Sequence, residues 1–420
     1  IPRAGGFWPE QAGNPTFSVK NHLLALNSGA TNLEIFVFTR MYMRSPRILP
    51  EFLAWADEID DAGRISDQNH LEAALGSPWS PGRSGYRKIE EFCAAMGAGE
   101  KPCAAEEGFA WVRPERLMRL VQSLAYAIPQ HVHGRWVNAR LMHCLFNPSI
   151  DSSLDLAQNV RDFHERNNKH PDRTLNFSAF YNAKTQSYDL TPDDVLNHVM
   201  CPENILYREL KNIIGPDITD QESFTRTERY YLRNYDSALL VNDVDGQYYE
   251  AFRKLLLRHY RAGTLGDYVH QTVKNLRTCN VELYPFRSSW VSGVEDLQNV
   301  YSDFSARLVL YRLARYLRDE QESEPGFWLV MRSRDAWYRQ IQSVLTNPEP
   351  RYGLRFDPQD ARELADWIFT TYAYEHSSRS AIMTPQNLRS LTPKANGSLQ
   401  KGECMSADEY TRLKRGILPG

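Results

Sequence analysis

The chain lacks the charge excess and the short motifs that would assign it to a narrow functional class. Its 49 basic residues are matched by 52 acidic ones, which leaves a formal net charge of -3. A free nucleic-acid-binding protein usually carries a clear basic excess, so we expect any contact with nucleic acid to be weak, local or enclosed. No P-loop, Gly-x-Gly-x-x-Gly, Gly-x-Ser-x-Gly or His-Glu-x-x-His motif occurs, and no enzyme class is therefore indicated.

Paired cysteines and long apolar runs are also missing. The six cysteines are spread over 420 residues, and none of them forms a Cys-x-x-Cys pair. We therefore expect reduced thiols in a cytosolic setting. No apolar run is long enough to cross a bilayer, so we expect no membrane contact. Hydrophobic residues still make up 42% of the chain, which is enough to build a substantial core and excludes general disorder.

Helix signals dominate what is present. The run Thr191-Pro192-Asp193-Asp194 has the composition of a helix N-terminus, with a capping residue, Pro and acids in the first turn. Apolar residues at helical spacing predict a long helix from about Val294 to Asp319. The expected fold class is mostly α, a large helical shell-type domain with a minor β element and extended terminal arms. The few strand candidates are Asn32–Met43, a hairpin of Leu175–Tyr181 with Ser187–Leu190, Val281–Phe286 and Phe327–Met331.

Three parts of the chain are expected on composition. Residues 1–16 form an extended N-terminal arm, residues 17–383 a predominantly helical body with room for a protruding subdomain, and residues 384–420 a C-terminal arm with a short helix. The arms are rich in Pro, Gly, Ser and Asn. Such segments usually need a partner to hold them, and a neighbouring subunit is the simplest candidate.

The segment from Thr219 to Gly263 is the most distinctive of the sequence. Tyrosine and arginine recur along it at helical spacing, and we predict a capped helix, a turn at Asp243 to Gly246 and a second helix. Tyr and Arg are enriched at protein–protein contacts, although core packing of the tyrosines and a solvated face for the arginines are alternatives. The interface candidates are Phe7 and Trp8 of the N-terminal arm with Tyr230, Tyr231, Arg233, Tyr235, Tyr248, Tyr249, Arg258 and Tyr260.

The run Asn242-Asp243-Val244-Asp245-Gly246 within this segment, which we call the acidic knot, suggests a metal site. Asn242, Gly246 and Glu250 have the spacing of one helical face and resemble the second metal motif of class I terpene synthases. Oxygen ligands on one face can hold Mg²⁺ that bridges phosphates. The aspartate-rich partner motif has only one candidate, Asp57 to Asp61, and it lies too far upstream. The favoured alternative is a turn between two helices, with Gly246 relaxing the backbone.

A second set of metal ligands is conceivable at His131, His133, His143 and Cys144. The alternative places the first two histidines at a turn after Pro129 and His143 with Cys144 in a helix. Because the spacing is loose, we expect no metal and no cofactor.

In its length, helix content, near-neutral charge, arms and missing catalytic motif, the chain resembles the coat proteins of partitiviruses, which are small double-stranded RNA viruses. The resemblance implies a structural capsid protein rather than an enzyme. Such a protein forms a dimer building block and self-assembles into a closed shell in the virion and the host cytoplasm. Its partners are identical subunits and an enclosed RNA held by weak contacts. The alternatives are a class I terpene synthase-like lyase dependent on Mg²⁺ and an RNA-encapsidating nucleoprotein.

Overall fold

The fold is seen in a computed structural model that describes thirteen segments of the chain. Almost all of them belong to one compact unit, Ile48–Gly420. The segments are residues 46–62, 68–98, 129–148, 180–185, 187–211, 231–242, 246–285, 299–321, 326–346, 354–368, 371–375, 382–394 and 398–418.

Within the described segments, eight strands form one mixed sheet in the order β10-β9-β8-β7-β2-β6-β1-β5. The four strands β6, β2, β7 and β8 run parallel, and β1, β9 and β10 are antiparallel to their inner neighbours. The strands are β1 Val132–His133, β2 Leu141–Leu145, β5 Met200–Cys201, β6 Thr278–Glu282, β7 Trp328–Met331, β8 Tyr372–Tyr374, β9 Leu388–Pro393 and β10 Leu399–Cys404.

The path of the chain through the parallel strands creates a switch point. From β2 the chain runs to the edge strand β5 and returns to β6, which lies beside β2; it then crosses over β2 to β7 on the other side and continues to β8. The parallel strands that follow β2 in the chain are therefore added on opposite sides of it. In open α/β sheets of this kind, ligands bind outside the carboxyl ends of the strands at the switch point. For this sheet, that position is the edge where β2 and β7 end.

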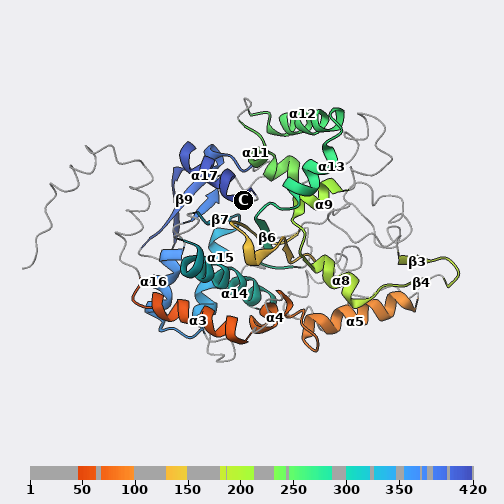
Figure 1. Ribbon diagram of the computed structural model, residues 1–420. Coiled ribbons are helices and arrows are strands. Elements are labelled where there is room, and N and C mark those ends of the chain that lie inside the picture. The colour runs from red at the N-terminus through yellow and green to blue at the C-terminus, as the bar shows by residue number, and fades with distance from the viewer. Residues whose placement is uncertain are drawn as a thin grey trace, which may run out of the picture. The chain divides into compact units, whose positions relative to one another are not determined.

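Helices cover both faces of the sheet (Figure 1). We call the face covered by α14 face A and the opposite face, covered by α9 and α17, face B. Face A packs against α3 Leu49–Ala62, α4 Gln68–Ala74, α5 Ser84–Gly97, α8 Pro192–Val199, α14 Val300–Arg315, α15 Arg334–Leu345 and α16 Pro358–Ile368. Face B packs against α9 Ile205–Lys211, the π-helix η5 Leu232–Asp236, α11 Ser237–Leu240, α12 Tyr248–Arg261, α13 Leu265–Asp267, the π-helix η6 Tyr268–Val273 and α17 Ala407–Ile417.

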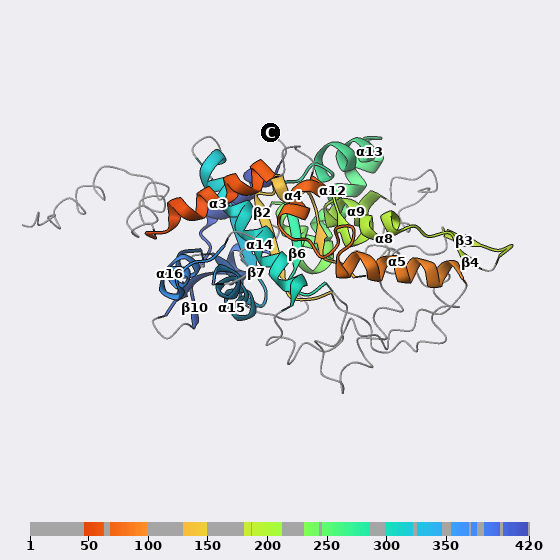
Figure 2. The same ribbon diagram turned by 90° about the horizontal axis from the view of Figure 1, so that it is seen from below.

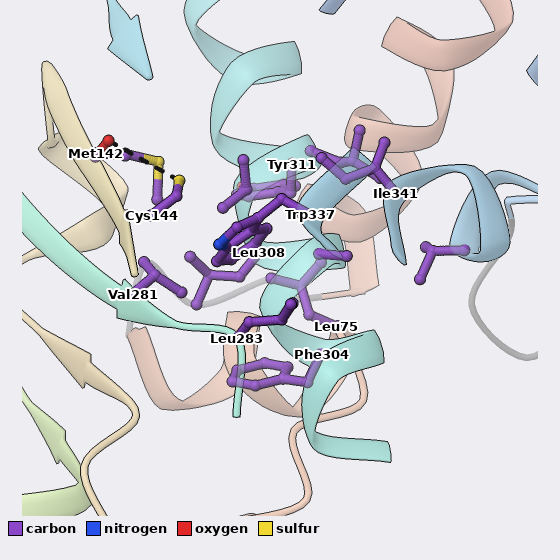
Figure 3. Close-up of a cluster of buried hydrophobic side chains, with 14 of the residues drawn as sticks. Leu75, Met142, Cys144, Val281, Leu283, Phe304, Leu308, Tyr311, Trp337 and Ile341 are labelled. Carbon is purple, nitrogen blue, oxygen red and sulfur yellow. Dashed lines mark hydrogen bonds between the residues drawn. The ribbon is translucent and has the colours of Figure 1, made fainter. Parts of the chain in front are cut away.

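Helix α14 is the centre of the face A core. Asn299 caps it by accepting hydrogen bonds from the backbone N–H groups of Tyr301 and Ser302, and 13 of its 16 residues are buried. Figure 2 shows α14 along the strands, with α3 and α15 beside it. Its side chains meet α15 and the inner faces of β2 and β6 (Figure 3). Each large apolar side chain buried there contributes about 1.5–3 kcal/mol to the free energy of unfolding, so this layer stabilises the packing of the helices on the sheet.

The expectation of a mostly helical shell-type domain with a minor β element is wrong, because an eight-stranded sheet lies between the helical layers. Its central strand β2 was expected to be helical at His143 and Cys144. All five residues of β2 are buried, and a short strand that is buried on both faces has no alternating pattern to identify it.

Other expectations fared unevenly. The strand candidates Val281–Phe286 and Phe327–Met331 overlap β6 and β7, and the hairpin is present as β3 Tyr181–Asn182 with β4 Ser187–Tyr188. The expected long helix is seen as α14 followed by the π-helix η7 Tyr316–Glu320. Residues 388–393 and 399–404, expected in an irregular arm, instead form β9 and β10. The candidate strand Asn32–Met43 and the arm at residues 1–16 lie outside the described residues.

Two glycines provide a matched test of backbone packing. Gly134 has φ of +115°, and a Cβ there would lie 2.3 Å from the carbonyl oxygen of Thr278 on β6. Gly246 has φ of +78° with nothing within 4 Å. We predict that Gly246→Ala lowers the free energy of unfolding by about 1–2 kcal/mol, the conformational cost alone. Gly134→Ala must also displace β6, and we expect it to cost more than about 3 kcal/mol in urea unfolding. Equal costs would contradict this packing.

Candidate functional site

A row of polar side chains crosses the middle of the sheet on face B. His133 of β1 pairs in register with Asn280 of β6, and Asn280 pairs in register with His143 of β2. Partners in register on neighbouring strands point to the same face and lie about 4.8 Å apart. All three side chains are buried. Strands covered on both faces are normally apolar, so this row needs an explanation other than packing.

We use the name polar layer for six residues of this face: His143, Asn280 and Tyr374 of the sheet, Tyr235 and Asp236 of η5, and Arg332, the first residue after β7. His143 and Asn280 are the middle residues of β2 and β6. Tyr374 is the last residue of β8, and the register of β7 with β8 places it level with Arg332. The polar layer therefore extends from the middle of β2 and β6 to the carboxyl ends of β7 and β8, beside the switch point.

His143 makes one hydrogen bond where two are possible. The hydroxyl of Tyr374 lies 3.0 Å from its Nε2, and the rings of Tyr235 and Tyr374 each lie 5.4 Å from the imidazole. Burial, reinforced by the charge of Arg332, lowers the pKa of His143 to about 3. The ring is therefore neutral at pH 7, and when Tyr374 donates to Nε2, Nδ1 carries the proton. Nδ1 has no hydrogen-bond partner within the described residues.

Asn280 has the same deficit on the neighbouring strand. Its Nδ2 makes no hydrogen bond to any part of the chain that the structure describes, and the side chain retains 7% exposure. A buried polar group left without a partner costs about 1–3 kcal/mol. Two such donors in register on adjacent strands form a pair that a third group, from outside the described residues, could satisfy.

The π-helix η5 supplies the opposite wall. Glu209 of α9 accepts hydrogen bonds from the backbone N–H groups of Tyr231 at 2.5 Å and Leu232 at 2.8 Å, which fixes where η5 begins. Arg332 donates to the hydroxyl of Tyr235. Single turns of π-helix are frequent at functional sites, because they shift side chains out of the regular helical register.

Asp236, the last residue of η5, is a buried acid beside Tyr374 and Tyr410. Desolvation raises its pKa to about 7. A carboxyl group with a pKa near the working pH can donate a hydrogen bond in one state and accept one in the other.

The histidines and Cys144 do not form a metal site. His131 lies 2.6 Å from both the Trp79 Nε1 and the Ser305 Oγ. His133 lies 2.9 Å from the amide of Gln130 and 3.1 Å from the guanidinium of Arg208. Cys144 belongs to the face A core, away from His143. Among the described residues, no group of three or more His, Cys, Asp or Glu is placed to hold a metal ion.

The acidic knot does not present its three residues on one helix. Helix α12 begins at Tyr248, so Asn242 and Gly246 precede it, and Gly246 has a left-handed φ of +78°. Asn242 accepts a hydrogen bond from Lys414 at 3.2 Å, while Glu250 pairs with Arg253 at 2.9 Å. Gly246 itself lies in a turn, as the alternative expects, while residues 243–245 lie outside the described residues. Asp57 and Asp60 of α3, members of the proposed partner motif, are paired with Arg318.

The interface candidates divide by burial. Tyr231 and Tyr235 are only 5% and 1% exposed and pack in the face B core, which is the core packing that was the alternative for these tyrosines. Arg233 and Arg258 are exposed, and Tyr248, Tyr249 and Tyr260 are half-buried. Phe7, Trp8 and Tyr230 lie outside the described residues.

The polar layer contains four residues that sequence reasoning missed: Asn280, Tyr374, Asp236 and Arg332. A usable signal exists for Asn280 and for His143, because each is a polar residue inside a buried run, TCNVE and LMHCL. No such sequence signal exists for Tyr374, Asp236 and Arg332, since only the pairing of distant strands brings them together.

Comparisons of the chain with protein-family models, with curated proteins and with solved structures find no match. No helix among the described residues is long and apolar enough to cross a membrane.

The buried Asp236 predicts a pH-dependent stability difference. Its pKa rises from 3.8 in the unfolded chain to about 7 in the folded protein, so the folded state keeps a proton that the unfolded state loses between these values. Stability therefore falls as pH rises through this window, by about 4 kcal/mol in total. Asp236→Asn abolishes this loss, so the variant should gain on the wild type in urea unfolding between pH about 4 and pH about 8. A difference that is constant with pH would show that Asp236 ionises freely.

Proposed function

We propose that the chain is a ligand-binding α/β protein that takes a small, planar, polar ring compound of the nucleoside type in the polar layer. The observation that carries this proposal is the pair of buried, unpartnered donors, His143 Nδ1 and Asn280 Nδ2. Their positions on adjacent strands match ring edges that offer neighbouring acceptors.

The walls of the polar layer suit a ring. Tyr235 and Tyr374 supply aromatic surface next to His143 and to each other, and aromatic side chains pack well against flat ligands. Asp236 can meet either a donor or an acceptor of the ligand, because its pKa of about 7 leaves both protonation states populated near neutral pH. Open α/β sheets also accommodate nucleotide-type ligands at their switch points, which is an analogy of fold and adds to the residue-level argument.

Arg332 and Tyr374 hold the side chains of Tyr235 and His143 in position by hydrogen bonds. Arg332 fixes the hydroxyl of Tyr235 by a hydrogen bond, and Tyr374 fixes the tautomer of His143. These contacts hold the unpartnered donor in place before a ligand arrives, and such preorganisation reduces the entropy lost on binding.

The test uses adenosine, guanosine, cytidine and uridine as probes at millimolar concentration, with calorimetry and thermal unfolding as readouts. Asn280→Leu replaces the amide by an apolar group of similar size. It should weaken binding of the preferred nucleoside about tenfold or more, because a buried hydrogen bond is lost. It should not lower the stability of the free protein, since the amide has no partner to lose.

The matched control is Asn275→Ala, which removes an exposed asparagine that donates hydrogen bonds to the backbone carbonyls of His270 and Gln271. This variant should bind the preferred nucleoside with the affinity of the wild type. The proposal fails if no nucleoside binds the wild type, or if Asn280→Leu binds it equally well.

The coat-protein function implied by the partitivirus resemblance stays a prediction, as do the absence of catalysis, the subunit and RNA partners and the virion location. It predicts purified protein in particles of far higher mass than the 48.5 kDa chain. Light scattering measures this directly. A monomer or a single dimer at high concentration would contradict a closed shell and would leave the polar layer unaffected.

A further inference from the structure

A second charged group lies at the same edge of the sheet, on face A. Arg334 opens α15, Arg389 lies on β9 and Lys401 on β10. Arg389 and Lys401 pair with Glu375, the residue directly after Tyr374, and Arg334 is close enough to Lys401 to act on its charge. Arg389 Nε lies 3.0 Å and Lys401 Nζ 4.0 Å from the same Glu375 oxygen. We call Arg334, Arg389 and Lys401 the cation cluster.

The positive charge of the cation cluster is not balanced by its neighbours. Glu375 is shared by two of the cations, and the ion pair of Arg334 with the largely exposed Asp335 is 3.6 Å long. Nε and Nη1 of Arg334 are shielded from solvent, yet they donate no hydrogen bond to the described residues. Burial lowers the pKa of Lys401, opposed by Glu375 and reinforced by Arg334 and Arg389. Asp335 and Glu375 thus supply two negative charges against three positive ones, and the remaining positive charge favours an anion nearby.

The cation cluster is joined to the polar layer by the chain itself. Tyr374 and Glu375 are consecutive residues at the end of β8, and Arg332 and Arg334 flank Ser333 after β7. A ligand lying across these strand ends would therefore have its ring on face B and a substituent toward face A. The two unpartnered donors and the cation cluster call for different chemical groups on one molecule.

We infer that the cation cluster binds the phosphate of the ligand, so that the substrate class is a nucleoside monophosphate rather than a free nucleoside. This inference rests on the proposed function. Arginine and lysine donate charge-assisted hydrogen bonds to phosphate oxygens, and the unused Arg334 nitrogens are suited to a bidentate contact. A phosphate dianion would also offset the excess positive charge.

The experiment compares each nucleoside with its 5′-monophosphate by calorimetry on the wild type, Arg389→Gln, Lys401→Gln and the control Lys184→Gln, an exposed lysine of the β3–β4 turn. We expect the monophosphate to bind the wild type and the control at least about tenfold tighter than the nucleoside. Arg389→Gln and Lys401→Gln should lose that gain and keep the nucleoside affinity. Partly exposed ion pairs contribute little to stability, so both variants should fold.

The outcomes separate the two proposals. Equal affinity for nucleoside and monophosphate in the wild type overturns the phosphate inference and leaves the proposed function standing. If no nucleoside binds, the proposed function fails, and inorganic phosphate becomes the probe. Stabilisation of the wild type and Lys184→Gln by phosphate over chloride at equal ionic strength, lost in Lys401→Gln, would support the cation cluster as an anion site. No difference between phosphate and chloride would overturn it.

Discussion

Burial of the central strands on both faces is the constraint on which the rest of the structure depends. Helix α14 and its neighbours cover face A, while α9, η5 and α17 cover face B, so β2 and β6 have no side open to solvent along their length. In such a position each polar side chain must find a partner or cost free energy. The chain accepts that cost at His143 and Asn280.

The architecture explains why the cost is concentrated where it is. The crossing from β6 back over β2 to β7 creates one edge where strand connections diverge. Only there can a ligand approach the ends of buried strands. Arg332, Tyr374 and Asp236 meet at this edge although they are far apart in sequence. The polar layer on face B and the cation cluster on face A thus both lie next to the residues that follow β7 and β8.

Local features were predictable from the sequence where short-range physics controls them. Three such features depend only on neighbouring residues: the capping box of α8 at Thr191 and Asp194, the N-terminus of α17 at Ser406 and the apolar stripe of α14. The sheet was underestimated for the opposite reason. Its strands are two to six residues long, and the central strand β2 pairs with β6 and β7, which lie more than a hundred residues further along the chain. No local pattern records such a pairing.

The same limit applied to the site. The tyrosine- and arginine-rich segment was predicted to be a contact surface. Tyr235 instead packs against His143, because η5 lies on face B with this side chain in the core. His143 itself was considered as a metal ligand. Its hydrogen-bond partner is Tyr374, and its Nδ1 has no partner among the described residues. Both facts depend on β2 being a strand beside β6 and β7. Residue identity was informative, but its meaning required the register of the sheet.

The most direct measurement is nuclear magnetic resonance of the His143 ring and the Asn280 side-chain amide, isotopically labelled, during titration with the preferred nucleoside. The proposed function predicts that the Nδ1–H and Nδ2–H₂ protons lack hydrogen-bonded shifts in the free protein and move downfield together as the ligand saturates. Resonances that are already hydrogen-bonded without ligand, or that stay unchanged at saturation, would contradict it.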